Sequence, residues 1–473
     1  MSLTRRIAHN TIIQIAGKVI STAMGIFVVG LLTRYLGADG YGRYTTVIAF
    51  LQVFAVILDL GLYIILIKKI SEPNSDTSKF VNNIFTLRLL SAIIFLGIAP
   101  VVAFFFPYPF IVKIGIALTT LSYLFISLNQ VLTGLFQKNL KMVKITIAEI
   151  VGRIVLLTAT GIVLYLKMDL LAILGAVILG SLSNFLYVFF AARQYVKIRL
   201  TFEWPVWLQV LKESWPIGLS VAFNLVYFKA DTIILSIYQP ASDVGIYGAT
   251  YKVLEILSTL PAMFAGLIMP LLTAAYAVRN FDRFRQIIQK SVNFLFILAL
   301  PLIIGTQFIA EQLMVLVAGG EFVGSGAVLR ILIVATGIIF IGALFGNAVV
   351  SINKQKPMIL AYLIVAIVSL AGYIILIPRY SFYGAAYMTI ASEFLIMLTS
   401  FYMVYRTTKA RLNFNIMGRA LLASLFMTII LWFTRDLHWV LLVFIGILSY
   451  ASSLYLLKGV TKNDITEILS LSK

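Results

Sequence analysis

Long apolar runs separated by short polar loops repeat along the whole chain. One helical crossing of a bilayer needs about 20 apolar residues. Runs of this kind are centred near residues 22, 55, 96, 124, 155, 181, 226, 259, 303, 339, 368, 395, 425 and 449. The pattern predicts an all-α integral membrane protein with about fourteen transmembrane helices. No loop between the runs is long enough to fold as a separate globular domain.

Two turns far apart in the chain resemble each other. RYLGADGYGRY covers residues 34–44 and YQPASDVGIY covers residues 238–247, and a long apolar run follows each turn. Gly42 of the first turn corresponds to Gly245 of the second, at an offset of 203 residues. A second similar pair, QKNLKM at 137–142 and NKQKPM at 353–358, has an offset of 216 residues. The two pairs predict an internal repeat of roughly 200 residues, as in many transporters.

The charge of the loops predicts the orientation in the membrane. Lys and Arg number 24 in the termini and every second loop, and only 6 in the other loops. Since basic loops stay on the cytoplasmic side, we expect both termini to be cytoplasmic in a plasma or inner membrane. The predicted domains are residues 1–200 with helices one to six, 201–412 with helices seven to twelve, and 413–473 with a closing pair. Six is an even number, so the two six-helix repeats are predicted to be parallel.

The amino-acid composition indicates a membrane protein and excludes several kinds of functional site. Hydrophobic residues make up 61% of the chain and charged residues 12%, whereas about a quarter of a soluble domain is charged. The absence of Cys excludes disulfides, Cys-ligated metals and thiol catalysis. His9 and His438 are too far apart to suggest a metal site, and we expect no cofactor. The net charge of +19 follows mostly from the loops and requires no nucleic-acid partner.

The first apolar run contains Gln14 and Lys18 and lacks a cleavage site, which predicts a retained helix and not a signal peptide.

Polar residues recur at helical spacing inside five of the predicted helices. In the first helix they follow steps of three and four residues, which places them on one face. The five stripes are Thr11, Gln14, Lys18, Ser21 and Gly25; Thr45, Gln52 and Asp59; Thr146, Glu149, Arg153 and Thr160; Ser220, Asn224, Tyr227 and Asp231; and Lys252, Glu255 and Thr259. Because the stripes belong to both lobes, they predict a shared hydrophilic cavity.

Charged residues inside these helices are candidates for function. Placing one in a bilayer costs about 2.5–3.5 kcal/mol on insertion scales, so such residues normally face protein or water. Lys18 has no acid within one helical turn, which favours a functional cation. Glu149 with Arg153 and Lys252 with Glu255 have the spacing of helical ion pairs, so a purely structural role stays open for both pairs. Residues 1–200 hold 18 basic and 6 acidic side chains, which favours an anionic substrate.

Four stretches carry a family resemblance: NTIIQIAGKVIS at 10–21, RYLGADGYGRY at 34–44, ADTIILSIY at 230–238 and DVGIYGATYKVLE at 243–255. Together with the plan of six plus six plus two helices, they resemble polysaccharide flippases of the Wzx type. These belong to the multidrug/oligosaccharidyl-lipid/polysaccharide exporter superfamily. The resemblance covers the whole chain.

The resemblance implies a function and a set of site residues. The expected substrate is an oligosaccharide linked to a polyprenyl phosphate or pyrophosphate, moved from the cytoplasmic to the outer leaflet by alternating access. Coupling to H⁺, Na⁺ or the membrane potential is expected, with membrane lipid and glycan-assembly proteins as further candidate partners. Candidate substrate-binding residues are Gln14, Lys18, Arg88, Arg153 and Lys252. Candidate ion-coupling residues are Asp59, Glu149, Asp231 and Glu255.

Two other functions remain as alternatives. A cation-coupled multidrug exporter of the same superfamily would share the fold, but it is expected to have twelve helices and lobes dominated by acids. A membrane glycosyltransferase or polymerase would need acids positioned for sugar chemistry. The sequence has no paired-carboxylate pattern, no nucleotide-binding glycine loop with a Lys and no nucleophile motif. We therefore expect a transporter and not an enzyme.

Overall fold

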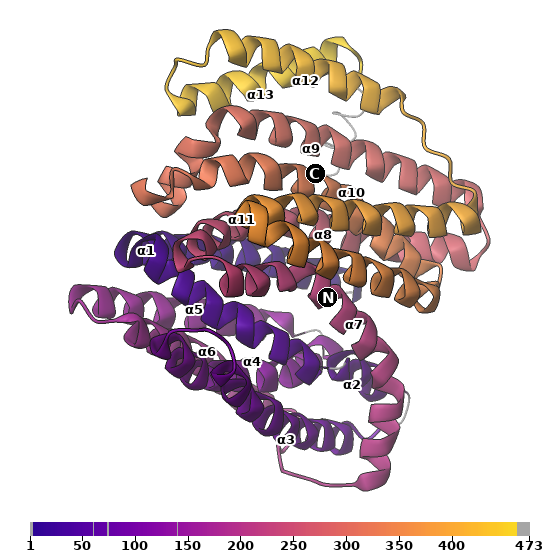
Figure 1. The fold of residues 1–473 in the computed structure, drawn as a ribbon. Coiled ribbons are helices and arrows are strands. Elements are labelled where there is room, and N and C mark those ends of the chain that lie inside the picture. Colours follow the sequence, from indigo (N-terminus) through magenta and orange to yellow (C-terminus); the bar gives the residue numbers. More distant parts are fainter. Residues whose placement is uncertain (1–2, 60, 73–74, 140, 461–473) are drawn as a thin grey trace. The chain divides into compact units, whose positions relative to one another are not determined.

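The computed structural model describes residues 3–59, 61–72, 75–139 and 141–460, and every regular element in these ranges is a helix (Figure 1). Eleven helical segments of this part are long and apolar enough to cross a membrane. The all-α membrane fold predicted from the sequence is confirmed. The protein is therefore a multi-pass membrane protein.

The helices follow one another with short connections. Their bounds are α1 (Leu3–Asp59), α2 (Leu62–Ser71), α3 (Thr77–Phe104), α4 (Phe110–Lys138), α5 (Met142–Tyr165), α6 (Leu170–Ala192), α7 (Trp204–Tyr238), α8 (Ala241–Ala277), α9 (Phe281–Ala318), α10 (Ser325–Ser351), α11 (Gln355–Thr408), α12 (Asn415–Phe433) and α13 (Trp439–Leu456), with a 3₁₀ turn at Gly320–Phe322. The centres predicted from hydropathy all lie inside these helices.

Two of the helices contain a break. Gly37 has φ 65° within α1, and Ser381 has φ 49° within α11. Each break separates two of the predicted centres, so α1 and α11 each hold two apolar runs. The number of fourteen crossings stays a prediction, because the helices of the described residues do not map one to one onto the runs.

The described chain divides into two compact units, Met1–Gly248 and Ala249–Lys473. This division falls inside α8. The predicted lobes, at 1–200, 201–412 and 413–473, stay a prediction.

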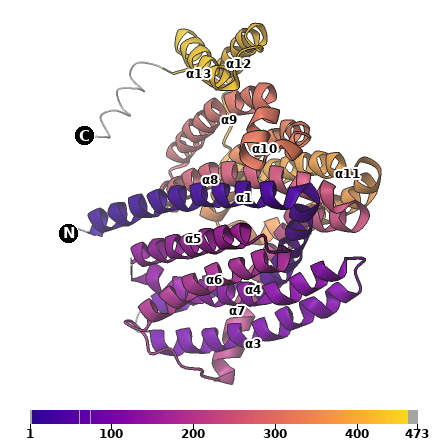
Figure 2. The same cartoon turned by 90° about the vertical axis from the view of Figure 1, so that its left-hand side faces the viewer.

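In the first unit, α3, α4, α6, α5 and α1 lie side by side, each in contact with the next (Figure 2). Their buried faces form two apolar cores. One core surrounds Leu66, Leu132 and Phe136, and the other surrounds Leu51 and Ile116. The outer face of α3 carries exposed apolar side chains, among them Ile93, Ile94 and Val101, as suits contact with lipid.

In the second unit, α10 packs against α9 and α11, and α12 and α13 form a pair that packs on α9. The core of the helices α9 to α11 surrounds Leu295, Leu344 and Phe345. The hydroxyl of Tyr450 on α13 donates to the carbonyl of Ile297 on α9 at 2.9 Å. Together with an apolar cluster around Met427 and Leu431, this hydrogen bond joins the closing helix pair to α9.

The two similar turns of the sequence contact each other in the first unit. A Cβ atom built on Gly42 would lie 1.6 Å from the carbonyl oxygen of Ala241, and one built on Gly245 would lie 2.0 Å from that of Ala38. The contacts are reciprocal, since both Ala38 to Ala241 and Gly42 to Gly245 are offsets of 203 residues. A local two-fold axis between equivalent segments produces such reciprocity. The contact supports the internal repeat.

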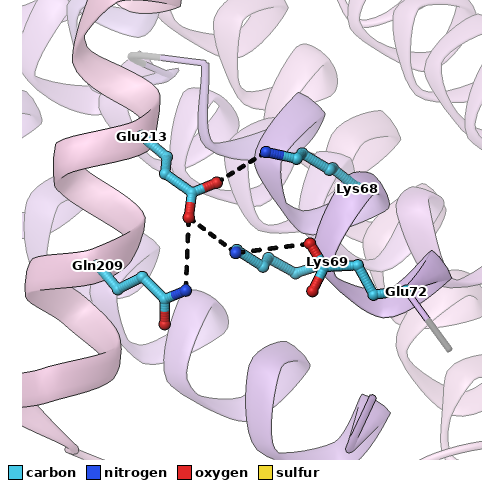
Figure 3. A network of polar contacts seen from close by, with 5 residues as sticks. All are labelled: Lys68, Lys69, Glu72, Gln209 and Glu213. Atoms are coloured by element: carbon cyan, nitrogen blue, oxygen red, sulfur yellow. Dashed lines mark hydrogen bonds and ion pairs between the residues drawn. The ribbon is translucent and has the colours of Figure 1, made fainter. Parts of the chain in front are cut away.

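An ion-pair network joins α2 to the beginning of α7 (Figure 3). The Glu213 carboxylate lies 2.7 Å from Lys69 Nζ and 3.0 Å from Lys68 Nζ. Gln209 Nε2 donates to Glu213 at 3.4 Å, and Lys69 Nζ also lies 3.5 Å from Glu72. Hydrogen bonds from Lys69 and Lys68 lower the pKa of Glu213 to about 2. The network therefore depends on an ionised Glu213.

Replacing Glu213 with Gln is expected to lower the free energy of unfolding by about 1 kcal/mol at neutral pH, the scale of a partly exposed ion pair. A lowered carboxyl pKa stabilises the fold above the ordinary value of 4.5, and this contribution disappears as the pH falls toward the folded-state pKa. The difference in melting temperature between wild type and Glu213→Gln should be full at pH 7 and shrink below pH 4.5. Glu72→Gln, which removes only the longer contact, is the control. Identical melting of wild type and Glu213→Gln at pH 7 would contradict the prediction.

Candidate functional site

The first unit contains two adjoining cavities between α1, α2, α4, α5 and α6. The first, the Lys18 cavity, has a volume of about 290 Å³, and its polar lining residues are Lys18, Ser21, Ser122, Glu149, Arg153, Ser181 and Asn184. The second, the Asn129 cavity, has a volume of about 330 Å³, and its polar lining residues are Asp59, Tyr63, Asn129, Gln130, Thr133, Glu149, Ser181 and Asn184. Four lining residues are common to both: Ile126, Glu149, Ser181 and Asn184. The cavities are therefore neighbours that share one wall.

The Lys18 cavity forms where the polar stripes of α1 and α5 meet. Arg153 Nε donates to Ser21 Oγ at 3.3 Å. A Cβ atom on Gly25 would lie 3.7 Å from Arg153 Nη1, and one on Gly17 would lie only 2.0 Å from a methyl carbon of Thr146. Gly17 lets α1 approach α5 closely. The predicted stripes of these two helices face each other here.

Lys18 and Glu149 line the Lys18 cavity with no hydrogen bond or ion pair to another residue in the part of the chain that the structure describes. Lys18 is exposed and Glu149 is half-buried. The i, i+4 spacing of Glu149 and Arg153 suits a helical ion pair, but within these ranges none is formed. Lys18, Glu149 and Arg153 are therefore charged groups that a ligand in the cavity can reach.

Arg88 lies behind the Asn129 cavity and does not line it. Its side chain is 1% exposed, and Nη1 lies 2.9 Å from Asp59 Oδ1. It donates to the Leu58 carbonyl at 2.7 Å, to Ser127 Oγ at 2.6 Å and to Gln130 Oε1 at 2.5 Å. A buried guanidinium held by so many acceptors is well compensated. Arg88 positions Asp59 and Gln130, which do line the cavity.

Asp231 is fully buried and lines neither cavity. Its carboxylate accepts from the hydroxyl of Tyr247 at 2.6 Å and from the backbone N–H of Thr232 at 2.5 Å. Asp231 thus connects α7 to the start of α8. The other polar positions predicted on this helix, Ser220, Asn224 and Tyr227, have side chains outside the described residues, as does Thr11 of α1.

The remaining predicted site residues lie apart from the cavities. Gln14 is exposed and lines neither of them. Lys252 and Glu255 belong to the second unit, where Lys252 Nζ lies 2.7 Å from Glu255 Oε2. The structure brings together Lys18, Arg153, Glu149 and Asp59 from the predicted set. Their roles in binding and coupling stay predictions.

The sequence patterns missed the amides of the Asn129 cavity. Asn129 and Gln130 lie on α4 and Asn184 lies on α6, and Asn129 Nδ2 donates to Asn184 Oδ1 at 2.9 Å. A signal was present, since Ser122, Asn129 and Thr133 follow steps of seven and four along α4. These are the same steps that define the stripes of α1 and α5.

Glu393 on α11 was also missed. It is 9% exposed and makes no hydrogen bond or ion pair within the described ranges. A signal existed here too, because Glu393 is an acid in an apolar run and the next basic residue along the chain is Arg406. Glu393 belongs to the second unit and is the one buried acid among the described residues of that unit.

The arrangement suits an anionic ligand that also carries hydroxyl or amide groups. Lys18 and Arg153 offer positive charge in the Lys18 cavity, Asn129 and Gln130 offer amides in the Asn129 cavity, and the amide of Asn184 lies in the wall that both share. Among the described residues, no group of three His, Cys, Asp or Glu side chains is placed to hold a metal ion. The charged and amide side chains of the two cavities can bind such a ligand by charge and hydrogen bonds.

Comparison with family models gives two matches. The model of the family described as "Polysaccharide biosynthesis protein" matches residues 7–276, and the MatE model matches residues 216–375. The first match covers more than half of the chain and includes every residue of the two cavities.

Two relatives match most of the chain. A "Putative O-antigen transporter" of Shigella flexneri is 21% identical over 402 residues, which are 80% of this chain and 93% of the relative. The "Capsular polysaccharide biosynthesis protein CapF" of Staphylococcus aureus is 22% identical over 399 residues, 82% of this chain and 96% of the relative.

A solved structure shares the fold. The structure described as "Lipid II flippase MurJ, inward closed conformation" superposes with a TM-score of 0.78 at 16% sequence identity, covering 93% of this chain and 97% of that chain. At this identity, the similarity concerns the fold alone.

Proposed function

The chain belongs to the polysaccharide biosynthesis protein family, and on this premise we propose that it is a flippase for an oligosaccharide linked to a polyprenyl phosphate or pyrophosphate. It is a membrane transporter and not an enzyme. The observation that carries the proposal is the Lys18 cavity, where Lys18 and Arg153 line a space inside a membrane-embedded unit.

The physical argument rests on the charge of the phosphate. An anion that leaves water for the interior of a membrane loses its hydration, a cost of several kcal/mol even in a protein. Basic side chains in a water-accessible cavity replace that hydration and concentrate anions there. Lys18, which has no partner in the described part, and Arg153, whose one hydrogen bond among the described residues goes to Ser21 Oγ, are the groups that supply this charge.

The relatives support the glycan part of the proposal. The names of the Shigella flexneri and Staphylococcus aureus proteins refer to O-antigen transport and capsular polysaccharide biosynthesis. The solved structure with the same fold is named a lipid II flippase. We infer a substrate of the same chemical class for this chain, with the glycan and phosphate inside and the polyprenyl tail in the surrounding lipid.

We infer further that transport runs from the cytoplasmic to the outer leaflet of the cell membrane, by alternating access and with both termini cytoplasmic. Coupling to H⁺ or Na⁺ requires an acid that can exchange its ion. Glu149 is the best candidate, because it lines both cavities without an ion pair in the described residues. Asp59, Asp231 and Glu255 each have a protein partner that holds the carboxylate.

A multidrug exporter is the second candidate, because the MatE model matches residues 216–375. Exporters of cationic drugs would be expected to bind their substrates with acids. The Lys18 cavity contains Glu149 but also two basic residues, Lys18 and Arg153. This balance favours an anionic substrate over a cationic drug.

The test is reconstitution of the purified protein in vesicles that contain undecaprenyl-pyrophosphoryl N-acetylglucosamine in both leaflets. A galactosyltransferase added outside, with radioactive UDP-galactose, labels only the sugar of the outer leaflet. We expect the protein to make the inner-leaflet lipid accessible as well, so that labelling rises above that of protein-free vesicles. No rise would contradict the proposal, and transport of ethidium by the same vesicles would favour the exporter.

A further inference from the structure

We propose that the Asn129 cavity is the subsite for the sugar next to the phosphate, and that it takes a neutral sugar. The inference rests on the proposed function, because it assumes that the phosphate binds in the adjoining Lys18 cavity. It goes further because it assigns the phosphate and the sugar of the head group to different cavities. It also names the residues that form hydrogen bonds with the sugar.

The first step is the orientation of the amide groups. Arg88 Nη2 donates to Gln130 Oε1 at 2.5 Å, so the carbonyl end of that side chain is occupied and its amide nitrogen is left to donate. Asn129 Nδ2 donates to Asn184 Oδ1 at 2.9 Å, which likewise leaves the amide nitrogen of Asn184. Neither nitrogen has a partner in the part of the chain that the structure describes. Two fixed amides thus offer N–H donors to a ligand in the cavity.

The second step is the supply of acceptors. Asp59 and Glu149 line the same cavity, and carboxylates accept hydrogen bonds from hydroxyl groups. The charge of Asp59 is balanced by Arg88 at 2.9 Å. A sugar presents hydroxyl groups that both donate and accept, so it matches a wall that combines amide donors with carboxylate acceptors. The cavity volume of about 330 Å³ lies within the range of small-ligand sites.

The third step is the difference in charge between the cavities. Both basic side chains, Lys18 and Arg153, line the Lys18 cavity, and no basic residue is among the described residues that line the Asn129 cavity. A phosphate is therefore favoured in the first cavity. A carboxylate on the sugar is disfavoured in the second, because Glu149 lines it and no basic side chain of the described lining balances that charge. Glu149 and Asn184 belong to both cavities, so one head group can occupy the two together.

The experiment measures binding of three lipids to the purified protein by native mass spectrometry. They are undecaprenyl pyrophosphate without sugar, the same lipid carrying N-acetylglucosamine, and the same lipid carrying glucuronic acid. Wild type is expected to bind the N-acetylglucosamine lipid about tenfold more tightly than the sugarless lipid, the effect of two or so added hydrogen bonds. The glucuronic acid lipid should bind no more tightly than the sugarless one.

Asn184→Ala is expected to reduce the tenfold preference to about threefold, because only the Gln130 amide remains as a donor. Asn184 lines both cavities, so the preference is taken as the ratio of the two affinities within each variant, and binding of the sugarless lipid shows that the variant is folded. Asn184→Ser, which keeps a polar side chain, is measured if the alanine variant is unstable. The matched control is Ser183→Ala, because the Ser183 hydroxyl donates to the Gly180 carbonyl at 2.9 Å and Ser183 lines neither cavity.

The outcomes separate the subsite from the proposed function. Wild type that binds all three lipids equally, or Asn184 variants that keep the full preference, would overturn the sugar subsite and leave the flippase standing. Tightest binding of the glucuronic acid lipid would overturn the assignment to a neutral sugar. Failure of wild type to bind any of the lipids would overturn both.

Discussion

Replacing Lys18 with Ala is expected to reduce transport of the lipid-linked oligosaccharide by about 10- to 100-fold, the effect of losing one hydrogen bond to a charged group. Lys18 lines the cavity with no other partner among the described residues, so its removal leaves a bound phosphate with Arg153 alone. Both the vesicle assay and complementation of a flippase-null strain measure the loss. The amount of protein in the membrane should not change, because Lys18 makes no described contact that the fold needs.

Two further variants decide whether the charge of Lys18 is what matters. Lys18→Arg keeps the charge in a larger side chain and should retain part of the activity. Lys113→Ala is the matched control, since Lys113 Nζ donates to the Phe104 carbonyl at 3.1 Å and lies 5.4 Å from the centre of the Phe104 ring. Its loss should leave transport unchanged. Full activity of Lys18→Ala would remove Lys18 from the phosphate site.

The polar faces of α1 and α5 could be predicted from the sequence, because side chains three or four residues apart lie on the same face of a helix. Lys18 and Ser21, three residues apart, and Glu149 and Arg153, four apart, must share a face of their own helix. The spacing does not say which neighbouring helix that face meets. In the structure the answer depends on close packing, where Gly17 approaches Thr146 and brings the two faces together.

The role of Arg88 could not be predicted from the spacing of residues along the chain. In the sequence it is one basic residue in an apolar run, equally suited to binding a phosphate or to a buried structural role. Its partners Asp59, Ser127 and Gln130 come from α1 and α4, at sequence separations that no local period connects. The role of such a residue is decided by tertiary contacts.

The two similar turns of the sequence correctly indicated that the two segments correspond to each other. They were a poorer guide to where the helices end. GADGYG at 37–42 was expected to separate two helices, yet in the structure the helix resumes directly after Gly37, whose φ of 65° makes the break. A single residue in this conformation changes the direction of the chain without a loop. The similarity of the two turns, in contrast, corresponds to a real contact between them.

Replacing Gly42 with Ala is expected to remove most of the folded protein from the membrane. The added Cβ would lie 1.6 Å from the Ala241 carbonyl oxygen and 3.0 Å from the Gly245 nitrogen, so the backbones of α1 and α8 must separate. Overpacking usually costs about 1–3 kcal/mol, and a clash with backbone atoms, which have no rotamer to change, should reach or exceed the upper end. Size-exclusion chromatography of a fluorescent fusion and the melting temperature measure the loss.

Gly97→Ala is the matched control, because a Cβ at Gly97 of α3 meets no atom within 4 Å. It should leave the yield and the melting temperature unchanged. The reciprocal contact gives a second prediction, for Gly245. A Cβ atom added there would lie 2.0 Å from the Ala38 carbonyl oxygen. If the two turns are equivalent around a local two-fold axis, Gly245→Ala must destabilise the protein about as much as Gly42→Ala does. A large loss from one substitution and none from the other would show that the repeat in the sequence does not extend to the contact.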